Sequence, residues 1–253
     1  MIDLHCHLLP GVDDGSRSVE QSVRVLARMA SEGVTGVCLT PHLSASRAEK
    51  GIPEAHDAAF DALRAQAPGE VTLSRGVELM MDRPLTPGAA ANPLLRLGGT
   101  RYLLIEFTRL ASATTVANAV AHVVKLGCLP LVAHPERYTG CSVASVTHWR
   151  ELGALMQVDA TTPWRPTGRG ARARALLAAG VVDILAADNH GDDRTLGSAR
   201  ARLDTQRAGA EADLLLLRNP AAILADQPVD PVPPVSIRTS ILTRVRTLLD
   251  EDR

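Results

Sequence analysis

The stretch MIDLHCHLLPGVDDG, residues 1–15, opens the chain and alternates polar with apolar side chains. In an extended strand, Asp3, His5 and His7 would share one face, because successive side chains of a strand point to opposite sides. Two imidazoles spaced in this way can bind one metal ion. Two aspartates follow in a turn and could bring a carboxylate to the same place. The alternative interpretation is a polar strand edge followed by an ordinary turn.

Length and composition exclude several classes of protein. A chain of 253 residues can bury a full core and matches the size of a single α/β barrel. The 27 Lys and Arg residues balance 28 Asp and Glu residues, so no general attraction to nucleic acid or to a membrane surface is expected. Aromatic residues make up only 2% of the chain, which argues against platforms that stack on bases.

The four cysteines, Cys6, Cys38, Cys128 and Cys141, have no metal-ribbon or CxxC spacing. Most lie in or beside apolar runs, where a buried, reduced thiol is the usual state. The chain also lacks a secretory leader and an apolar span of about 18 residues. We therefore expect a cytoplasmic protein that does not insert into a membrane.

Seven short apolar runs predict buried strands, and most of them end at a polar residue. The runs after the opening strand are residues 36–40, 71–77, 102–107, 129–133, 155–159 and 181–187. Helical patterns alternate with them. The first is capped by Ser18 and Gln21, and others lie near 53–63, 116–124, 143–152, 171–179, 196–207 and 212–217. Residues 82–100 are rich in proline and glycine and are expected to form a rim loop or lid.

Strands that alternate with helices indicate a parallel sheet covered on both faces. We expect an α/β fold with a TIM-like barrel, since a barrel gathers the loops after every strand at one mouth. An open doubly wound sheet is the alternative, but it would collect ligands from only a few strands. Residues 1–226 form the predicted catalytic domain. Residues 227–253 comprise a proline-rich connector and a short amphipathic helix at about 241–249.

The residues at the predicted strand ends carry the chemistry. Nine of them are potential metal ligands: His5, His7, Asp14, His42, Glu78, Glu106, His134, Asp188 and His190. One ion cannot use so many ligands, so two or three clustered divalent ions are expected, with Mn²⁺ favoured and Zn²⁺ or Fe²⁺ as alternatives. A chance arrangement of hydrogen-bonded polar groups is the competing interpretation. His56, His122 and His148 fall within helical patterns and are taken as structural or surface residues.

Clustered metal ions at a barrel mouth indicate hydrolysis, since they activate water and polarise the attacked group. Arg137 and Arg194 lie on predicted mouth loops, and a guanidinium matches a tetrahedral oxyanion such as phosphate. Either arginine could instead pair with an acid such as Glu136 or Asp193. The pattern favours a phosphoester substrate, with both arginines as catalytic, phosphate-binding residues.

Several ordered motifs resemble the PHP (polymerase and histidinol phosphatase) superfamily. They are DLHCH (3–7), TPH (40–42), GVE (76–78), IEF (105–107), AHPERY (133–138) and DNH (188–190). The opening HLLPGVDDGSRS and the later NPAAILAD (219–226) resemble its bacterial protein-tyrosine phosphatase branch, which is associated with capsule and exopolysaccharide operons. The loop after His42 is less basic here than in that branch, and residues 227–253 extend beyond the family core.

The resemblance implies a distorted (βα)₇ barrel that binds up to three metal ions, often manganese, through the nine residues above. It also implies hydrolysis of phosphotyrosine, typically on the tail of a bacterial tyrosine kinase that controls polysaccharide export. No Cys-x₅-Arg loop is present, so a phosphocysteine intermediate is not expected. A small-molecule phosphatase resembling histidinol-phosphate phosphatase, a DNA-end nuclease and a non-catalytic metal-binding scaffold remain alternatives. The oligomeric state is left open.

Overall fold

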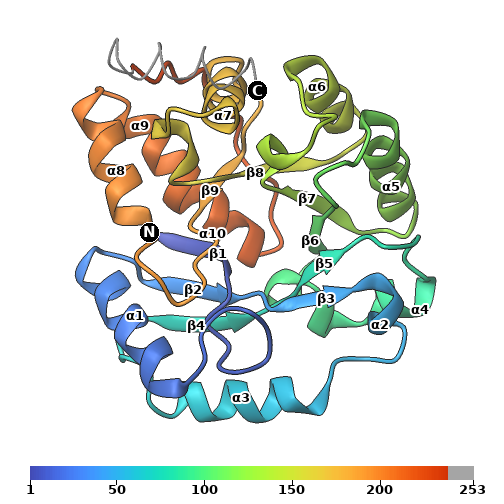
Figure 1. The fold of residues 1–253 in the computed structure, drawn as a ribbon, viewed down its shortest axis with the longest axis vertical. Coiled ribbons are helices and arrows are strands. Elements are labelled where there is room, and N and C mark those ends of the chain that lie inside the picture. Colours follow the sequence, from blue (N-terminus) through green and yellow to red (C-terminus); the bar gives the residue numbers. More distant parts are fainter. Residues whose placement is uncertain (239–253) are drawn as a thin grey trace.

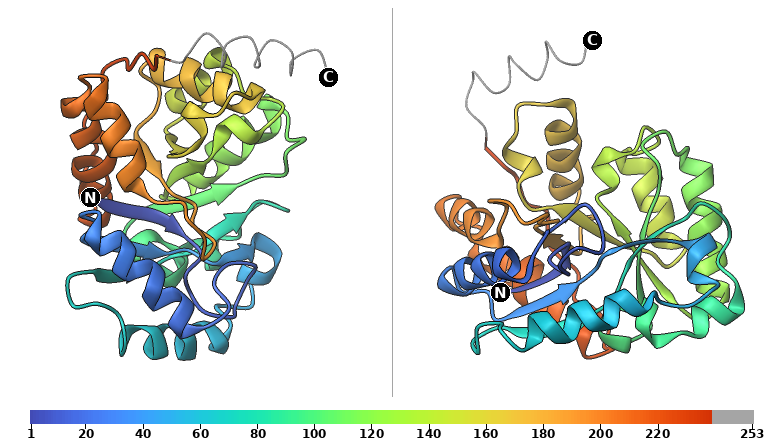
Figure 2. Two further views of the ribbon diagram at one scale, coloured as in Figure 1. Left: turned by 60° about the vertical axis from the view of Figure 1, so that its left-hand side comes forward. Right: turned by 60° about the horizontal axis from the view of Figure 1, so that its bottom comes forward.

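The computed structural model describes residues 1–238, and strands form its centre while helices lie around them (Figures 1 and 2). Every pairing between named strands is parallel. The strands are β1 (Ile2–Cys6), β2 (Gly36–Leu39), β3 (His42–Ser44), β4 (Thr72–Arg75), β5 (Glu78–Met80), β6 (Tyr102–Glu106), β7 (Leu129–Ala133), β8 (Leu155–Asp159) and β9 (Ile184–Ala186).

The longer helices follow the strands in the order that the sequence predicts. They are α1 (Val19–Ser31), α3 (Glu54–Arg64), α5 (Ala113–Lys125), α6 (Val143–Glu151), α7 (Gly168–Ala178) and α8 (Leu196–Thr205). Shorter helical segments are α2 (Ala45–Ala48), α4 (Pro87–Ala91), η1 (Pro93–Leu95), η2 (Leu97–Gly99), η3 (Pro135–Arg137), η4 (Thr162–Trp164), α9 (Gly209–Asp213), η5 (Leu214–Arg218) and α10 (Asn219–Leu224). The predicted helix at 241–249 lies outside the described residues.

The strands form two hydrogen-bonded sheets, β1-β2-β4 and β3-β5-β6-β7-β8-β9. β2 leads into β3 and β4 into β5 after two-residue interruptions, so each of these predicted strands is followed by a further short strand that the sequence pattern did not predict. At the other edge, the Asp188 N–H donates to the His5 carbonyl at 2.9 Å, and the His7 N–H donates to the Asn189 carbonyl at 2.7 Å. The chain after β9 therefore lies beside β1. The predicted α/β fold with parallel strands is confirmed. We call the two sheets, with β1 beside the chain after β9, the ring.

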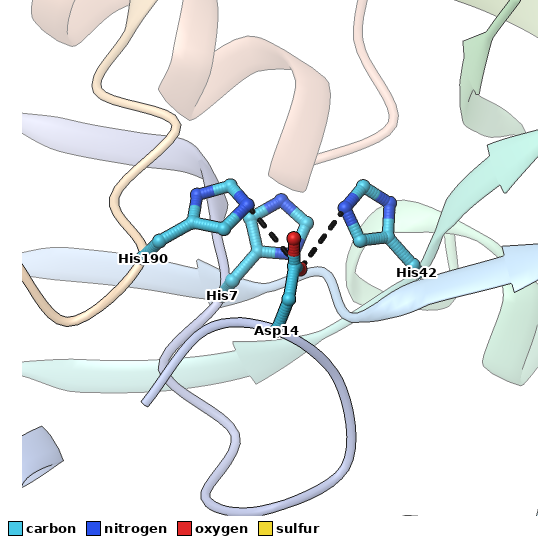
Figure 3. A group of neighbouring side chains, drawn as sticks. All are labelled: His7, Asp14, His42 and His190. Carbon is cyan, nitrogen blue, oxygen red and sulfur yellow. Dashed lines mark ion pairs between the residues drawn. The ribbon is translucent and has the colours of Figure 1, made fainter. Parts of the chain in front are cut away.

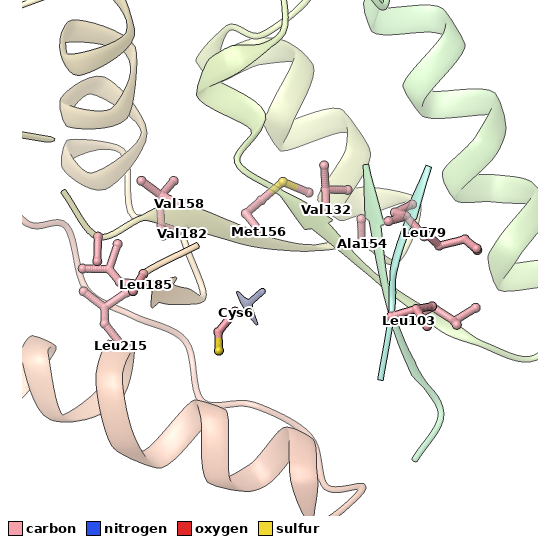
Figure 4. Close-up of a cluster of buried hydrophobic side chains, with 14 of the residues drawn as sticks. Cys6, Leu79, Leu103, Val132, Ala154, Met156, Val158, Val182, Leu185 and Leu215 are labelled. Carbon is pink, nitrogen blue, oxygen red and sulfur yellow. The ribbon is translucent and has the colours of Figure 1, made fainter. Parts of the chain in front are cut away.

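Two apolar clusters hold the strands in place. One lies between the strands and the outer helices and includes Leu103, Met156 and Leu185 (Figure 4). The other contains Leu4, Leu104 and further residues from the alternate positions of the strands. Leu, Val and Ala dominate both clusters, as the low aromatic content requires. Burial of this surface stabilises the ring that positions the strand ends.

The first strand contains an irregularity that the sequence pattern did not predict. Between Asp3 and Cys6 the chain advances three residues, while the paired segment of β2 advances only two, from Val37 to Leu39. The carboxylate of Asp3 accepts the N–H groups of His5 and Ala187 instead of pointing with the two histidines. The expectation that Asp3 shares a functional face with them is therefore wrong, because the extra residue changes the alternation.

Residues 82–100 do not form the expected lid or rim loop. Residues 82–86 remain irregular, but most of the segment folds into α4, η1 and η2, and Ala90, Leu95 and Leu97 are buried. The side chain of Arg96 donates to the Ala90 carbonyl at 3.0 Å and ties the turns together. The prolines and glycines lie at the starts and ends of short helical turns, while the apolar residues between them pack into the core.

Residues 227–238 run as an extended segment across the outside of the domain. The Tyr102 hydroxyl donates to the Gln227 carbonyl at 2.7 Å, and the Val235 N–H donates to the Leu177 carbonyl at 2.9 Å. Val232 and Val235 are buried. This part of the connector thus packs on the domain. Among residues 1–238, no helix has the length and apolar character needed to cross a bilayer.

The loop between β1 and α1 packs so closely that it should not tolerate a methyl group at Gly15. A Cβ at this position would lie 2.0 Å from the His7 carbonyl oxygen. We predict that Gly15→Ala destabilises the protein by at least about 1–3 kcal/mol, measured by urea unfolding. Gly69→Ala is the matched control, since nothing lies within 4 Å of its added Cβ. Equal stability of both variants would contradict the loop packing described here.

Candidate metal centre

All nine side chains singled out from the sequence lie at the end of the ring where the strands finish. Four of them belong to strands, namely His5, His42, Glu78 and Glu106, whereas the others are on segments just beyond strand ends. Three groups of ligand atoms result, and within each group every ligand atom lies within 4.8 Å of the others. The groups are His5, His7, Glu78 and Asp188; His7, Asp14, His42 and His190; and His42, Glu78 and Glu106.

The first group is fully enclosed. The Nε2 atoms of His5 and His7 are 3.1 Å apart. The Glu78 Oε2 atom lies 3.1 Å from the first nitrogen and 3.3 Å from the second, and the Asp188 Oδ1 atom lies 3.3 Å from both. All four residues are at most 1% exposed.

This geometry fits a divalent cation better than a hydrogen-bond network. Glu78 Oε2 and Asp188 Oδ1 are buried, and neither makes a hydrogen bond of acceptable geometry within the described residues, although imidazole nitrogens are close. Two nitrogens that are each about 2.1 Å from one ion lie roughly 3.0–3.4 Å apart at tetrahedral to octahedral angles. The separation of 3.1 Å between His5 and His7 falls within that range. Four lone pairs therefore converge on one point.

The second group lies closer to solvent. Asp14 is mostly exposed, and its Oδ1 atom is 3.5 Å from Nε2 of both His42 and His190 (Figure 3). The ring of His190 stacks on that of His7, with centroids 4.0 Å apart. His7 belongs to both groups, so the two groups are adjacent. Its Nε2 atom can bind only one ion, and the two groups therefore cannot both use it.

Glu78 links the remaining residues. Its Oε1 atom is 2.7 Å from Nε2 of His134, and its Oε2 atom is 3.0 Å from Nδ1 of His42. The same His42 nitrogen is 3.1 Å from Glu106. His134 belongs to none of the three groups and contacts the centre through Glu78. The buried carboxylate thus lies near four imidazoles from three stretches of the chain, residues 5–7, 42 and 134.

The electrostatics of the centre keep the Glu78 carboxylate charged in spite of its burial. Burial acts to raise the pKa of Glu78, but His5 and His134 hold it well below its usual range. Burial acts to lower the pKa of His42, but hydrogen bonds with Glu106 and Glu78 outweigh this effect and raise it to about 10. The centre is therefore an anionic site that attracts positive charge.

Two residues outside the predicted set orient the histidines. Asp13 Oδ2 is 2.8 Å from Nδ1 of His7, and Gln157 Oε1 is 3.0 Å from Nδ1 of His5. Both contacts leave Nε2 directed at the centre, as carboxylates and amides behind metal-bound histidines do. Sequence analysis did not identify Gln157, although it is a polar residue in the otherwise apolar run of β8. Asp13 is one of the two turn aspartates from which the sequence predicts a carboxylate near the histidines.

Both predicted arginines adjoin the centre through Asp188. Its Oδ1 atom faces the histidines, whereas Oδ2 contacts Arg137 and lies 3.4 Å from Arg194. Arg137 also lies 3.4 Å from Asp159. Burial would raise the pKa of Asp188, but His5, His7 and Arg137 hold it below its usual range. One carboxylate therefore separates the histidine cluster from two guanidinium groups.

The other histidines do not join the centre, in agreement with their interpretation as structural or surface residues. His56 is buried in α3, and His122 contacts the Leu85 carbonyl at 2.7 Å. His148 is exposed and pairs with Glu151 at 3.6 Å. Cys6, which stands between the two opening histidines, is buried in the outer apolar cluster. All four cysteines are unpaired and buried.

Removal of the central carboxylate should abolish the response to metal. We predict that Mn²⁺ raises the melting temperature of the wild type, by the equivalent of about 2.7 kcal/mol at one hundred times the dissociation constant. In Glu78→Gln most of this increase should be lost, because the buried charge that contacts four imidazoles is gone. Differential scanning calorimetry with Mn²⁺ and with EDTA measures the difference for each variant.

Glu151→Gln, on the exposed surface of α6, is the matched control and should respond as the wild type does. A full Mn²⁺ response in Glu78→Gln would show that the buried cluster is not a metal site.

Comparison with known proteins places this site in context. The family model described as capsular polysaccharide synthesis, CpsB/CapC, matches residues 1–225. The chain is 27% identical to tyrosine-protein phosphatase YwqE of Bacillus subtilis, covering 94% of this chain and 97% of that protein. It is 26% identical to tyrosine-protein phosphatase CpsB of Streptococcus pneumoniae, covering 90% and 99%.

Solved structures show the same fold. The structure described as that of YwqE from Bacillus subtilis and CpsB from Streptococcus pneumoniae, unique metal-dependent tyrosine phosphatases, superposes with a TM-score of 0.77 at 24% identity, covering 93% of this chain and all of that one. Dihydropyrimidinase from Brevibacillus agri superposes with a TM-score of 0.54 at 12% identity, covering 93% and 73%.

Proposed function

Because this chain belongs to the capsular polysaccharide synthesis family CpsB/CapC, we propose that it is a metal-dependent phosphoester hydrolase that acts on phosphotyrosine in proteins. Two relatives that align over nearly the whole chain are named tyrosine-protein phosphatases. The observation that carries the proposal is the position of Asp188, with one oxygen toward the histidine cluster and the other toward two arginines. A phosphate at this boundary would meet the bound metal ions on one side and the two guanidinium groups on the other.

We assign two to three divalent ions, with Mn²⁺ favoured, to the centre. The ligands would be His5, His7, Asp14, His42, Glu78, Glu106, His134, Asp188 and His190. Oxygen and nitrogen donors without thiolate suit this class of ion. When bound, the ions would lower the pKa of water and neutralise the charge of the substrate phosphate.

The protein's own groups prepare this site before a substrate arrives. Asp13 and Gln157 hold the rings of His7 and His5 in one orientation, so that no side-chain rotation is needed when the site fills. Asp188 holds Arg137 and Arg194 together at the edge of the centre. Guanidinium groups fixed in this way can bind the peripheral oxygens of a phosphate and stabilise the charge that shifts among them during transfer.

The names of the relatives also support a proposal for the substrate. A phosphotyrosine-bearing protein, in particular the autophosphorylated tail of a bacterial tyrosine kinase in polysaccharide synthesis, would present a phenolic leaving group that departs with little acid assistance. A cytoplasmic location would place the enzyme beside such a kinase, and the four unpaired cysteines suit a reducing compartment.

A substrate panel tests the proposed activity. With Mn²⁺, the wild type should hydrolyse a phosphotyrosine peptide faster than histidinol phosphate and should leave single-stranded DNA intact, since no general basic field attracts nucleic acid. EDTA should abolish turnover, because the ligands alone do not activate water. Phosphate release measures the first two reactions and gel electrophoresis the third. Preferred cleavage of histidinol phosphate or DNA would overturn the assignment.

Loss of one guanidinium should slow the reaction without loss of the fold. We predict that Arg194→Gln lowers kcat/KM for the phosphotyrosine peptide by about tenfold to a hundredfold, since one charged donor to the phosphate is lost. Arg64→Gln, on exposed α3, is the control and should keep wild-type kcat/KM. Equal activity of the two variants would remove Arg194 from the phosphate site.

A further inference from the structure

A cavity of about 680 Å³ lies beside the candidate metal centre and is lined by an unusual number of cations. Its arginines, which we call the arginine pocket, are Arg109, Arg137, Arg165, Arg169, Arg172 and Arg194. Asp159 is the single carboxylate residue among the described residues that line it. The phosphate-binding role proposed above uses only two of these arginines.

The arginine pocket and the centre occupy the same end of the ring. Arg109 follows β6, while Arg165 and Arg169 follow β8, the latter on the first turn of α7. Arg137 and Arg194 line the pocket and also contact Asp188, so they lie between the pocket and the metal ligands. A substrate held by these two arginines therefore has the remaining arginines directly beside it.

The positive charge of the pocket is only partly neutralised by the protein, through the pairing of Arg137 and Arg194 with carboxylates. Asp159 is already engaged by Arg137 at 3.4 Å and by the Thr161 hydroxyl at 2.8 Å. Within residues 1–238, Arg109, Arg165 and Arg169 form no ion pair with a carboxylate. Like charges gathered around one cavity repel each other, and the repulsion is relieved when an anion enters.

Two further observations point to an anion in this place. The Nε–H of Arg172 is buried and has no hydrogen-bond partner, although its Nη1 donates to the Tyr138 carbonyl at 3.2 Å. Burial together with the adjacent cations Arg109, Arg137 and Arg172 lowers the pKa of Arg169. A buried donor without an acceptor and a guanidinium destabilised by its neighbours are both costly unless a ligand satisfies them.

We propose that the arginine pocket binds a second anionic group carried by the same peptide whose phosphotyrosine occupies the metal centre. The inference rests on the proposed phosphatase function. It adds that the enzyme prefers peptides with a second anionic group near the phosphotyrosine. The shared chemistry is an oxyanion, supplied either by a second phosphotyrosine or by aspartate and glutamate side chains. Because the pocket adjoins the centre, the second group belongs close to the first in the peptide sequence.

Three matched phosphotyrosine peptides test the proposal. One has glutamine neighbours, one has glutamate neighbours, and one has a second phosphotyrosine that is replaced by its non-hydrolysable phosphonate analogue. With Mn²⁺, the wild type should prefer the anionic peptides in kcat/KM by about tenfold, mainly through KM. If the glutamate peptide is preferred more strongly, carboxylate side chains are the source of the anion. If the phosphonate peptide is preferred more strongly, a second phosphotyrosine is the source.

The double variant Arg165→Gln/Arg169→Gln should bring the ratio of anionic to neutral kcat/KM close to one. The double variant Arg24→Gln/Arg64→Gln removes the same charge from α1 and α3, away from the pocket, and should keep the wild-type ratio. The proposal is wrong if the wild type shows no preference, or if the pocket variant retains the preference of the control.

A binding measurement separates failure of this proposal from failure of the proposed function. The same peptides with every phosphotyrosine replaced by the phosphonate are titrated by fluorescence anisotropy, with Mn²⁺ and with EDTA. Tighter binding of the anionic peptides, lost in the pocket variant, supports the arginine pocket even if no peptide is hydrolysed. Absence of turnover for all peptides refutes the phosphatase function, whereas equal binding of all peptides refutes the pocket.

Discussion

The buried carboxylates of Glu78 and Asp188 are the constraint around which the strand ends are arranged. Each lies within about 3 Å of imidazole nitrogens and has an oxygen without a hydrogen-bond donor of proper geometry. Buried charge is destabilising unless opposite charge is held close. Imidazoles from separate segments, two guanidinium groups and the proposed metal ions supply that charge. The mouth of the ring is therefore built to hold cations.

The parallel arrangement explains how residues distant in sequence meet at this site. β1 and the chain after β9 are joined by backbone hydrogen bonds, which bring His5 and His7 beside Asp188. The interruptions after β2 and β4 start new strands at His42 and Glu78. A break in the ladder thus places a ligand at the start of a strand as well as at the end of one, and so concentrates ligands from several segments in a small volume.

The two sides of the mouth have opposite electrostatic character. On one side, carboxylates and imidazoles form an anionic cluster suited to metal ions. On the other, the arginine pocket carries positive charge that the protein neutralises only in part. Asp188 stands at the boundary and contacts both. A phosphate at this boundary would be stabilised from both directions, and a neighbouring anion on the same chain would extend into the arginine pocket.

The sequence by itself determined the order of strands and helices, the nine potential ligands and the two arginines, because each follows a local pattern of apolar runs ended by polar residues. Only the tertiary structure decided what Asp3, Gln157 and the segment 82–100 do. An extra residue in β1 turns Asp3 to backbone N–H groups, Gln157 acts through the distant His5, and most of the segment 82–100 packs as helical turns. The clustering of Arg109, Arg165 and Arg169 likewise depends on the sheet, because β6 and β8 flank β7 and end on the same side of it, and such long-range proximity leaves no local pattern.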